Sequence, residues 1–244
     1  MKKIKIITLL SLMAISTASF AQLGKLLDKA KAAATGNTSS LNPADIATAL
    51  KQALEQGTSK SADLLSKENG FFGNAAVKIL FPPEAQKAEA TLRKLGLNKM
   101  CDDAILSFNR AAEDAAKEAK PIFISAIKNM TVNDAKSILT GPNDAATTYF
   151  KKTTTDSLAR VFEPIIQKSM DKVGATKYYT DVVERYNKVP FVSKLNPDLK
   201  AYVTQKAIEG LFTEVAQEEL KIRENPAFRT TDLMKKVFSS VEKQ

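Results

Sequence analysis

Residues 98–120 read NKMCDDAILSFNRAAEDAAKEAK, and this stretch decides the fold. Its apolar residues recur at the three- and four-residue spacing of one helix face, while charged residues occupy the opposite face. Most side chains on the apolar face are small, which lets a neighbouring helix approach closely. We therefore expect a central helix of an α-helical domain, with this buried face: Cys101, Ile105, Phe108, Ala112, Ala115, Ala116 and Ala119.

Further helix starts are signalled on both sides of this stretch. Asn, Asp and Thr cap helix N-termini, and Pro is favoured in the first turn. Thr131 and Asp134 also have the spacing of a capping box, in which each side chain bonds the other residue's backbone N–H. We predict starts at Asn42-Pro43, Pro82-Pro83-Glu84, Asn98, Thr131, Pro142, Asn196-Pro197-Asp198 and Thr231-Asp232.

Helix ends are signalled mainly by Gly after an apolar-periodic run. We expect Pro164 to kink or break the long helix that ends near residue 174. The 44–67 stretch is interpreted as two helices, the second burying Leu64, and a later helix is expected to bury Leu220. Ends are predicted at Gly57, Lys67, Gly96, Gly141, Gly174 and Asn225-Pro226.

Strand signals are weak throughout the chain. The best candidate is KVPFVSKL at 188–195, but Pro190 cannot donate a hydrogen bond to a neighbouring strand. The sequence therefore predicts an all-α protein with a single, bundle-like, multi-helix domain over 41–244. A short amphipathic helix and flexible linker are expected at 22–40; this segment either frays or lies on the domain, or rests on an anionic membrane surface.

Residues 1–21 have the features of an export signal. Three lysines precede an apolar run that is too short to span a bilayer, and Ser-Phe-Ala supplies small residues at the cleavage positions. Cleavage between Ala21 and Gln22 would remove three lysines and no acid, lowering the formal net charge from +9 to +6. The expected location is the periplasm or the exterior.

Composition excludes several kinds of chemistry. The chain has no His and one Cys, so His-dependent triads, His-ligated zinc and an internal disulfide are ruled out. Its scattered glycines match no phosphate-binding loop, and its dispersed lysines do not indicate nucleic-acid binding. Cys101 is expected to be a buried small hydrophobe, the alternative being an intermolecular disulfide or reactive thiol.

Several long blocks resemble one bacterial family. They include GFFGNAAVKILFPP at 70–83, LRKLGL at 92–97, FEPII at 162–166, and long stretches at 109–150 and 198–238. Together they resemble the bacterial domain-of-unknown-function family 4197 over about residues 41–239. The resemblance implies an exported, mostly helical bacterial protein, and it brings no established reaction, cofactor or catalytic residue.

A ligand site, if present, is predicted at the border between the polar and apolar faces of the 98–120 helix. At 100° per residue, Glu113 lies about 40° and Lys120 about 20° from Asn109, which favours half-buried side chains. Two downstream residues complete the candidate binding set: Asn109, Glu113, Lys120, Asp134 and Tyr149. No catalytic residue, metal site or cofactor is predicted.

Two functions remain open at this stage. The first is a non-catalytic binding or scaffold module of the cell envelope whose partner is acidic: phospholipid, lipopolysaccharide or protein. The second is a His-free hydrolase using Asp and Glu on an envelope polymer. The Glu113–Lys117 and Glu219–Arg223 spacings favour ordinary helix-surface ion pairs, which argues for the first.

Overall fold

The computed structural model describes residues 41–172, 174, 179, 180, 183, 184, 187, 194, 195 and 198–241. The chain divides into two compact units, Met1–Asn42 and Pro43–Gln244, and all helices named below belong to the second unit. The predicted export signal, the predicted 22–40 helix and most of the strand candidate at 188–195 lie outside the described residues.

Within the described residues the structure is helical and contains no strand, which confirms the all-α prediction. Two short 3-10 segments, η1 and η2, accompany the α-helices. In chain order the elements are α2 (Pro43–Leu65), η1 (Pro83–Ala85), α3 (Gln86–Lys94), α4 (Asn98–Ala116), α5 (Ala119–Asn129), α6 (Val132–Thr140), α7 (Ala145–Lys172), α9 (Leu199–Glu224), η2 (Pro226–Phe228) and α10 (Asp232–Val241).

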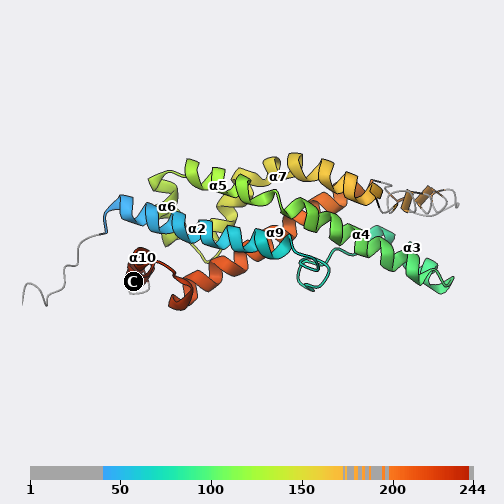
Figure 1. Ribbon diagram of the computed structural model, residues 1–244, viewed down its shortest axis with the longest axis horizontal. Helices are drawn as coiled ribbons and strands as arrows, with labels where there is room; N and C mark the ends of the chain where they lie inside the picture. Colours follow the sequence, from blue (N-terminus) through green and yellow to red (C-terminus); the bar gives the residue numbers. More distant parts are fainter. Residues whose placement is uncertain are drawn as a thin grey trace, which may run out of the picture. The chain divides into compact units, whose positions relative to one another are not determined.

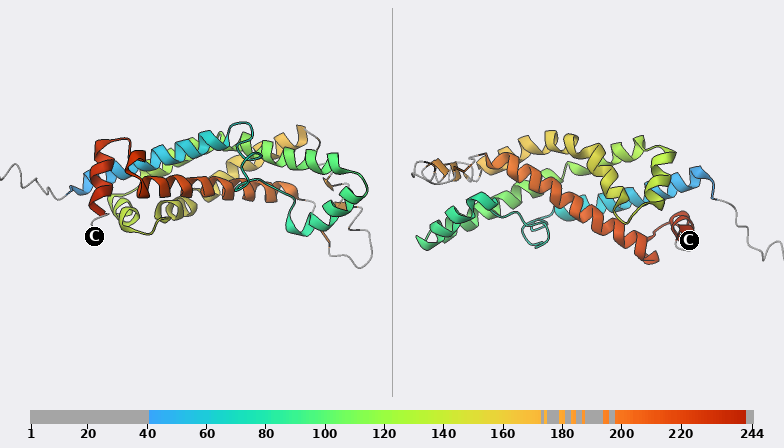
Figure 2. Two further views of the ribbon diagram at one scale, coloured as in Figure 1. Left: turned by 90° about the horizontal axis from the view of Figure 1, so that it is seen from below. Right: turned by 180° about the vertical axis from the view of Figure 1, so that it is seen from behind.

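Helix α9 is one of three long helices, with α2 and α7, on which most of the packing depends. It contacts α7 and α2 most extensively, and it also contacts α4. Helix α7 in turn packs on α4 and α5, whereas α2 packs on α5, α6 and α10. Figures 1 and 2 show α9 running along the helical unit, beside α2 toward one end and beside α7 toward the other.

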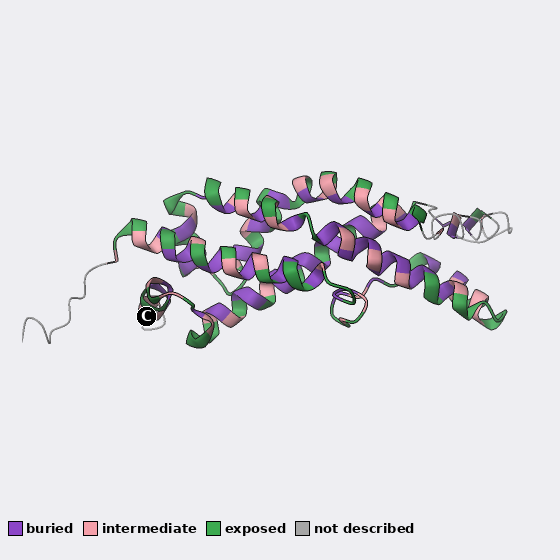
Figure 3. Cartoon of the chain, viewed as in Figure 1, coloured by how far each residue is buried: buried purple, intermediate pink, exposed green. Residues whose placement is uncertain are grey.

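Phenylalanine rings form the centre of the core. Phe108, Phe123, Phe150 and Phe162 have no exposed surface. The Phe123 ring packs edge-on against Phe150 at 5.2 Å and Phe212 at 6.2 Å between ring centroids, which links α5, α7 and α9. Figure 3 shows the buried residues on the faces that the helices turn toward one another.

The small-residue face of the 98–120 stretch is buried as predicted. The prediction that this stretch forms one continuous helix is wrong. Helix α4 ends at Ala116, and α5 begins at Ala119. Pro121, in the first turn of α5, has no N–H to offer the Lys117 carbonyl, and its ring would clash with that carbonyl in a continuous helix. The seven predicted residues are all buried: Cys101, Ile105, Phe108, Ala112, Ala115, Ala116 and Ala119.

The predicted helix end at Gly57 is also wrong, because α2 runs unbroken from Pro43 to Leu65. Gly57 is buried in the middle of α2 and faces α9. A Cβ at this position would lie 3.6 Å from the Glu218 Cβ and 3.7 Å from the Ile222 Cδ1. The glycine therefore marks a close approach between two helices and not a chain reversal.

Other boundary signals are confirmed. Helices α3, α6 and α7 end one or two residues before Gly96, Gly141 and Gly174. The capping box of α6 is present: the Asp134 N–H donates to the Thr131 Oγ1 at 3.1 Å, and the Thr131 N–H donates to the Asp134 carboxylate at 3.0 Å.

Pro164 does not break α7, which continues through it. The proline lies on the exposed side of the helix, where water can reach the carbonyl that it leaves unpaired. Two predicted core positions are wrong. Leu64 and Leu220, expected in the core, are 44% and 38% exposed. Leu64 directly precedes Leu65, which is fully buried, so the helix turns Leu64 toward solvent.

Candidate functional site

Asn109 of the predicted binding set lies fully inside the molecule. Its Nδ2 donates to the carbonyls of Ile79 at 2.8 Å and Ile105 at 2.7 Å, and its Oδ1 accepts from the Ile79 N–H at 2.8 Å. The amide thus pairs with both backbone polar groups of Ile79. It fastens the irregular segment between α2 and η1 to α4.

Glu113 makes a second attachment of the same segment. Its Oε1 accepts from the backbone N–H groups of Phe71 at 3.1 Å and Phe72 at 3.2 Å, and its Oε2 accepts from the Arg110 guanidinium. Phe71 is fully buried. The turn that carries Phe71 and Phe72 is therefore held to α4 through a buried carboxylate.

The two predicted surface ion pairs need correction. Glu113 does not pair with Lys117, whose ammonium instead donates to Asp114 at 2.8 Å. Glu219 and Arg223 do pair, at 2.9 Å, but their side chains are only 6% and 11% exposed. The acidic members of both predicted pairs are therefore interior groups.

The other three predicted residues lie on different helices. The Lys120 ammonium is 3.6 Å from the Asp63 carboxylate, and the Tyr149 hydroxyl donates to the Ala126 carbonyl at 3.3 Å. Asp134 belongs to the α6 capping box. The structure does not bring the five predicted residues together, and none of them lines the cavities described below.

Glu219 of α9 caps a different helix. Its carboxylate accepts from the N–H groups of Ala146 and Thr147, both at 2.9 Å, and from the Thr147 hydroxyl at 2.8 Å. These donors belong to the first turn of α7, where the helix dipole favours an anion. Arg223, one turn further along α9, donates to the Ile138 carbonyl at 2.7 Å and so caps the end of α6.

Two more glutamates of α9 are buried. Glu218 bonds the ammonium groups of Lys221 at 2.7 Å and Lys60 at 2.8 Å, and Glu214 accepts from the Asn74 amide at 2.8 Å. Burial alone would raise the pKa of Glu218, but the bonds from Lys221 and Lys60 outweigh it and lower that pKa below its ordinary value. Glu218 is therefore held ionised.

These contacts decide what the carboxylates can do chemically. The buried glutamates of the described residues each bond backbone N–H groups, an amide or basic side chains, and general acid–base work needs a carboxyl within reach of a substrate. Across the same residues, no three His, Cys, Asp or Glu side chains gather in a way that could hold a metal ion.

Cys101 is buried, as predicted, with 1% of its surface exposed. Its Sγ lies 4.0 Å from the Glu89 carbonyl oxygen. Burial raises the pKa of the thiol, which favours the unreactive protonated form. The residue is part of the packing between α3 and α4.

A groove of about 710 Å³ lies between α7 and α9. Buried Ile208 and Phe212 contribute apolar surface to it, and polar and charged side chains of both helices complete its walls. Its lining residues are Lys151, Thr155, Ala159, Glu163, Ala201, Thr204, Gln205, Ile208, Glu209, Phe212 and Thr213.

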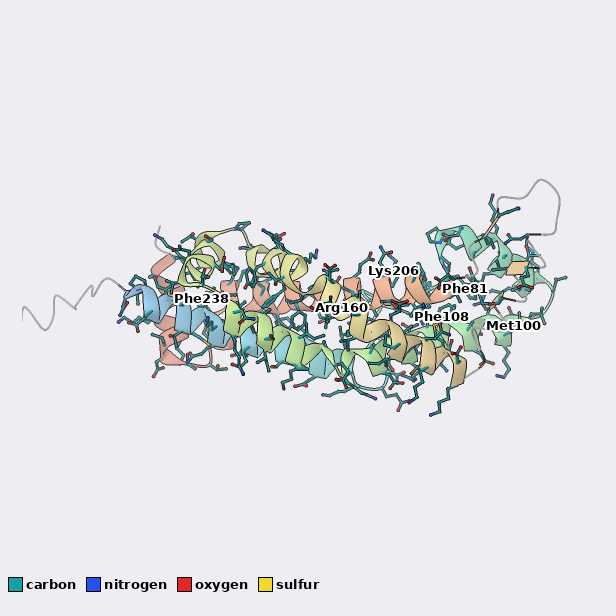
Figure 4. The ribbon with its side chains drawn as sticks, turned by 90° about the horizontal axis from the view of Figure 1, so that it is seen from above. Phe81, Met100, Phe108, Arg160, Lys206 and Phe238 are labelled. Atoms are coloured by element: carbon teal, nitrogen blue, oxygen red, sulfur yellow. The ribbon has the colours of Figure 1, made fainter. Side chains whose placement is uncertain are left out.

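A second groove, of about 540 Å³, lies on the other side of the same stretch of α9, against the 76–86 segment. The two grooves share three lining residues, so they flank one polar ridge of α9: Gln205, Glu209 and Thr213. Lys206, labelled in Figure 4, lines the second groove from α9, and Phe81 lines it from the 76–86 segment.

Thr204 lines the first groove, but its hydroxyl oxygen is buried. The residue is 6% exposed, and its Oγ1 has no hydrogen-bond partner within the described part of the chain. Helical threonines often bond the carbonyl four residues back, as Thr154 and Thr155 do on α7. A buried hydroxyl left without this bond is costly to the fold.

The helices that form both grooves lie within a region that matches a known protein family. The model of DUF4197, a family of proteins of unknown function, matches residues 40–239. The chain belongs to the DUF4197 family. The match spans α2 to most of α10 and includes both grooves. No curated protein and no solved structure matches the chain.

Sequence reasoning missed the groove residues of this DUF4197 protein. Lys151, Thr155, Gln205 and Glu209 resemble ordinary helix-surface residues, and nothing local reveals that a groove lies between α7 and α9. Each helix also contributes a small residue to the groove wall, Ala159 and Ala201, but recognising this from the sequence requires knowing which helices are neighbours.

Proposed function

We propose that the protein is a non-catalytic helical binding module of the bacterial cell envelope, with the α7–α9 groove as its contact surface. The observation that carries this proposal is the groove of about 710 Å³, which combines apolar surface from Ile208 and Phe212 with polar side chains such as Thr155 and Gln205. Binding sites typically join apolar walls to a few placed polar groups.

The proposed location rests on the sequence of residues 1–21. Its lysines, short apolar run and Ser-Phe-Ala end support export with cleavage between Ala21 and Gln22. Among the described residues no helix is both long and apolar enough to cross a bilayer. The formal net charge of +6 that remains after this cleavage, +9 less three lysines, supports an acidic partner, for which phospholipid, lipopolysaccharide and an acidic protein are the candidates.

The alternative, a His-free hydrolase, has less support. The acids that suggested it lie close together along two helices: Glu113, Asp114 and Glu118 on one, and Glu218 and Glu219 on the other. Glu113, Glu218 and Glu219 are occupied by backbone or basic groups inside the fold. Asp114 bonds Lys117 and Ser169, and Glu118 is exposed at the surface. Glu163 and Glu209 do line the α7–α9 groove. However, Glu163 is paired with Lys200 at 2.6 Å, and Glu209 is paired with Lys206 at 2.7 Å.

The test fills the groove with a bulky side chain. Purified wild type, Ala201→Trp and a matched control, Ala44→Trp, are immobilised and exposed to envelope extract, and bound lipids and proteins are identified by mass spectrometry. Ala201 lies in the groove, whereas Ala44 is an exposed residue at the start of α2. We expect a component that wild type and Ala44→Trp retain and that Ala201→Trp loses.

Two results would count against the proposal. Identical capture by all three proteins would show that the groove is not the contact surface. Cleavage of purified envelope polymer by the wild-type chain would instead favour the hydrolase. Circular dichroism of the two variants establishes that each is folded before capture is compared.

A further inference from the structure

The turn between α3 and α4 exposes two leucines at one end of the helical unit (Figure 1). Leu95 is 70% exposed and Leu97 is 42% exposed. Isolated exposed apolar side chains are common and need no explanation. Among the large apolar residues exposed in the described chain, however, these two alone lie within three positions of each other; the others are Leu64, Leu80, Val132 and Leu220.

The backbone of this turn satisfies its own hydrogen bonds. The Leu97 N–H donates to the Leu92 carbonyl at 3.0 Å, and the Gly96 N–H donates to the Arg93 carbonyl at 3.0 Å. With Gly96 at φ +80°, these two bonds form a Schellman motif. A turn closed in this way can leave water at low cost, because no N–H of the turn residues 95–97 is left without a partner.

The surroundings of the turn are open and basic. A Cβ placed on Gly96 would meet no atom within 4 Å. The stretch from Ala90 to Cys101 holds three basic residues and no acidic one. Lys94 is exposed, and the Lys99 side chain is 87% exposed.

The acidic neighbours of the turn lie further back along the helices and are paired. Asp103 bonds Lys99 at 2.6 Å, while Asp102 and Glu89 both bond Arg93 at 2.9 Å. From the turn inward, the leucines are therefore followed by Lys94, and then by Arg93 and Lys99, which pair with these acidic residues. This order matches the layers of a membrane surface, where apolar side chains enter the acyl boundary and lysines reach the headgroups.

We propose that the α3–α4 turn is a membrane-contact site that inserts Leu95 and Leu97 into the surface of a bilayer containing anionic phospholipid. A bilayer is favoured over a protein partner because a stable protein interface buries about 800 Å² on each side, far more than two leucines supply. A lipid surface needs no complementary shape. The proposal is independent of the α7–α9 groove, which lies on other helices.

The absence of Trp from the chain allows a site-specific test. Leu95→Trp places a single reporter at the turn, and Leu220→Trp places one at another exposed leucine, on α9. Each chain is mixed with vesicles of phosphatidylcholine and phosphatidylglycerol whose acyl chains are brominated. We expect blue-shifted, quenched emission from the reporter at 95 and unchanged emission from the reporter at 220.

Matched variants test the two parts of the proposal by vesicle flotation. Leu95→Ser with Leu97→Ser should weaken binding roughly tenfold or more, whereas Val132→Ser with Leu220→Ser should change it less than twofold. Lys94→Gln should weaken binding to anionic vesicles roughly fivefold.

Three results would overturn the proposal. The first is an unshifted emission at 95 when the chain is bound, which would place the contact on another segment. The second is equal emission changes at 95 and 220. The third is equal binding to vesicles of phosphatidylcholine alone, which would remove the anionic lipid from the proposal. Loss of groove binding by Ala201→Trp would leave all of these measurements unaffected, so the two proposals fail separately.

Discussion

At the scale of single residues, buried charged side chains bond backbone groups at helix ends and in a turn of this protein. Glu219 accepts the first N–H groups of α7, Arg223 donates to the last carbonyls of α6, and Glu113 accepts two N–H groups of the turn after α2. Each of these contacts joins segments far apart in sequence. A carboxylate in such a position specifies how elements meet, which gives these buried glutamates a structural role.

Glu113 therefore has a testable structural role. Replacing it with Ala leaves the Phe71 and Phe72 N–H groups without an acceptor and should lower the free energy of unfolding by about 2–4 kcal/mol. Glu55→Ala, at an exposed position of α2, should change it by less than ~0.5 kcal/mol. Urea denaturation monitored by circular dichroism measures both. Equal midpoints for the two variants would refute the anchoring role.

At the scale of elements, local signals predicted the helix boundaries well where the cause is local. The Thr131–Asp134 capping box and the ends near Gly96 and Gly141 depend only on nearby residues, and the structure confirms them. The predicted helix end at Gly57 was wrong because this glycine allows the close approach of α9, which lies more than 150 positions away in sequence. Helical periodicity predicted the helix face on which Asn109 and Glu113 lie. Their hydrogen-bond partners, Ile79 and the turn after α2, could be identified only from the fold.

Two glycines offer a matched test of helix packing. A Cβ on Gly57 would make ordinary contacts at 3.6 Å and 3.7 Å, whereas one on Gly210 would lie 2.7 Å from the Phe71 ring and 3.1 Å from the Val77 Cβ. Gly57→Ala should therefore stabilise the protein by about 0.5–1 kcal/mol, because Ala is the better helix residue. Gly210→Ala should destabilise it by ~1–3 kcal/mol through overpacking.

Thermal and urea unfolding of the two variants decides this comparison. The two changes in the free energy of unfolding are expected to have opposite signs, although both substitutions replace Gly with Ala within a helix. If both variants were stabilised, the segment carrying Phe71 and Val77 would not be packed against α9 as tightly as the structure shows.

At the scale of the whole molecule, the charge balance makes stability depend on ionised carboxylates. The chain carries 36 basic and 27 acidic residues, so protonating the acids leaves a large uncompensated positive charge. Several carboxyls have a pKa lowered below the ordinary value despite the opposing effect of burial. Bonds from Lys117 and Ser169 lower that of Asp114, and bonds from Lys206 and Gln205 lower that of Glu209.

Glu218 is the most buried of these groups and gives the clearest prediction for acid. Its folded-state pKa is below the ordinary value of 4.5, so its contribution to stability is present above that pH and is lost as the pH falls through the folded-state value. Wild type should therefore lose stability steadily below about pH 4.5. Glu218→Gln should cost about 1–3 kcal/mol at pH 7, because the buried side chain loses its charge-assisted hydrogen bonds from Lys60 and Lys221, whose own side chains stay half-exposed. Its stability should then fall less steeply between pH 5 and pH 3 than that of wild type. Urea midpoints at several pH values measure both slopes, and parallel curves would show that Glu218 takes no part in the acid sensitivity.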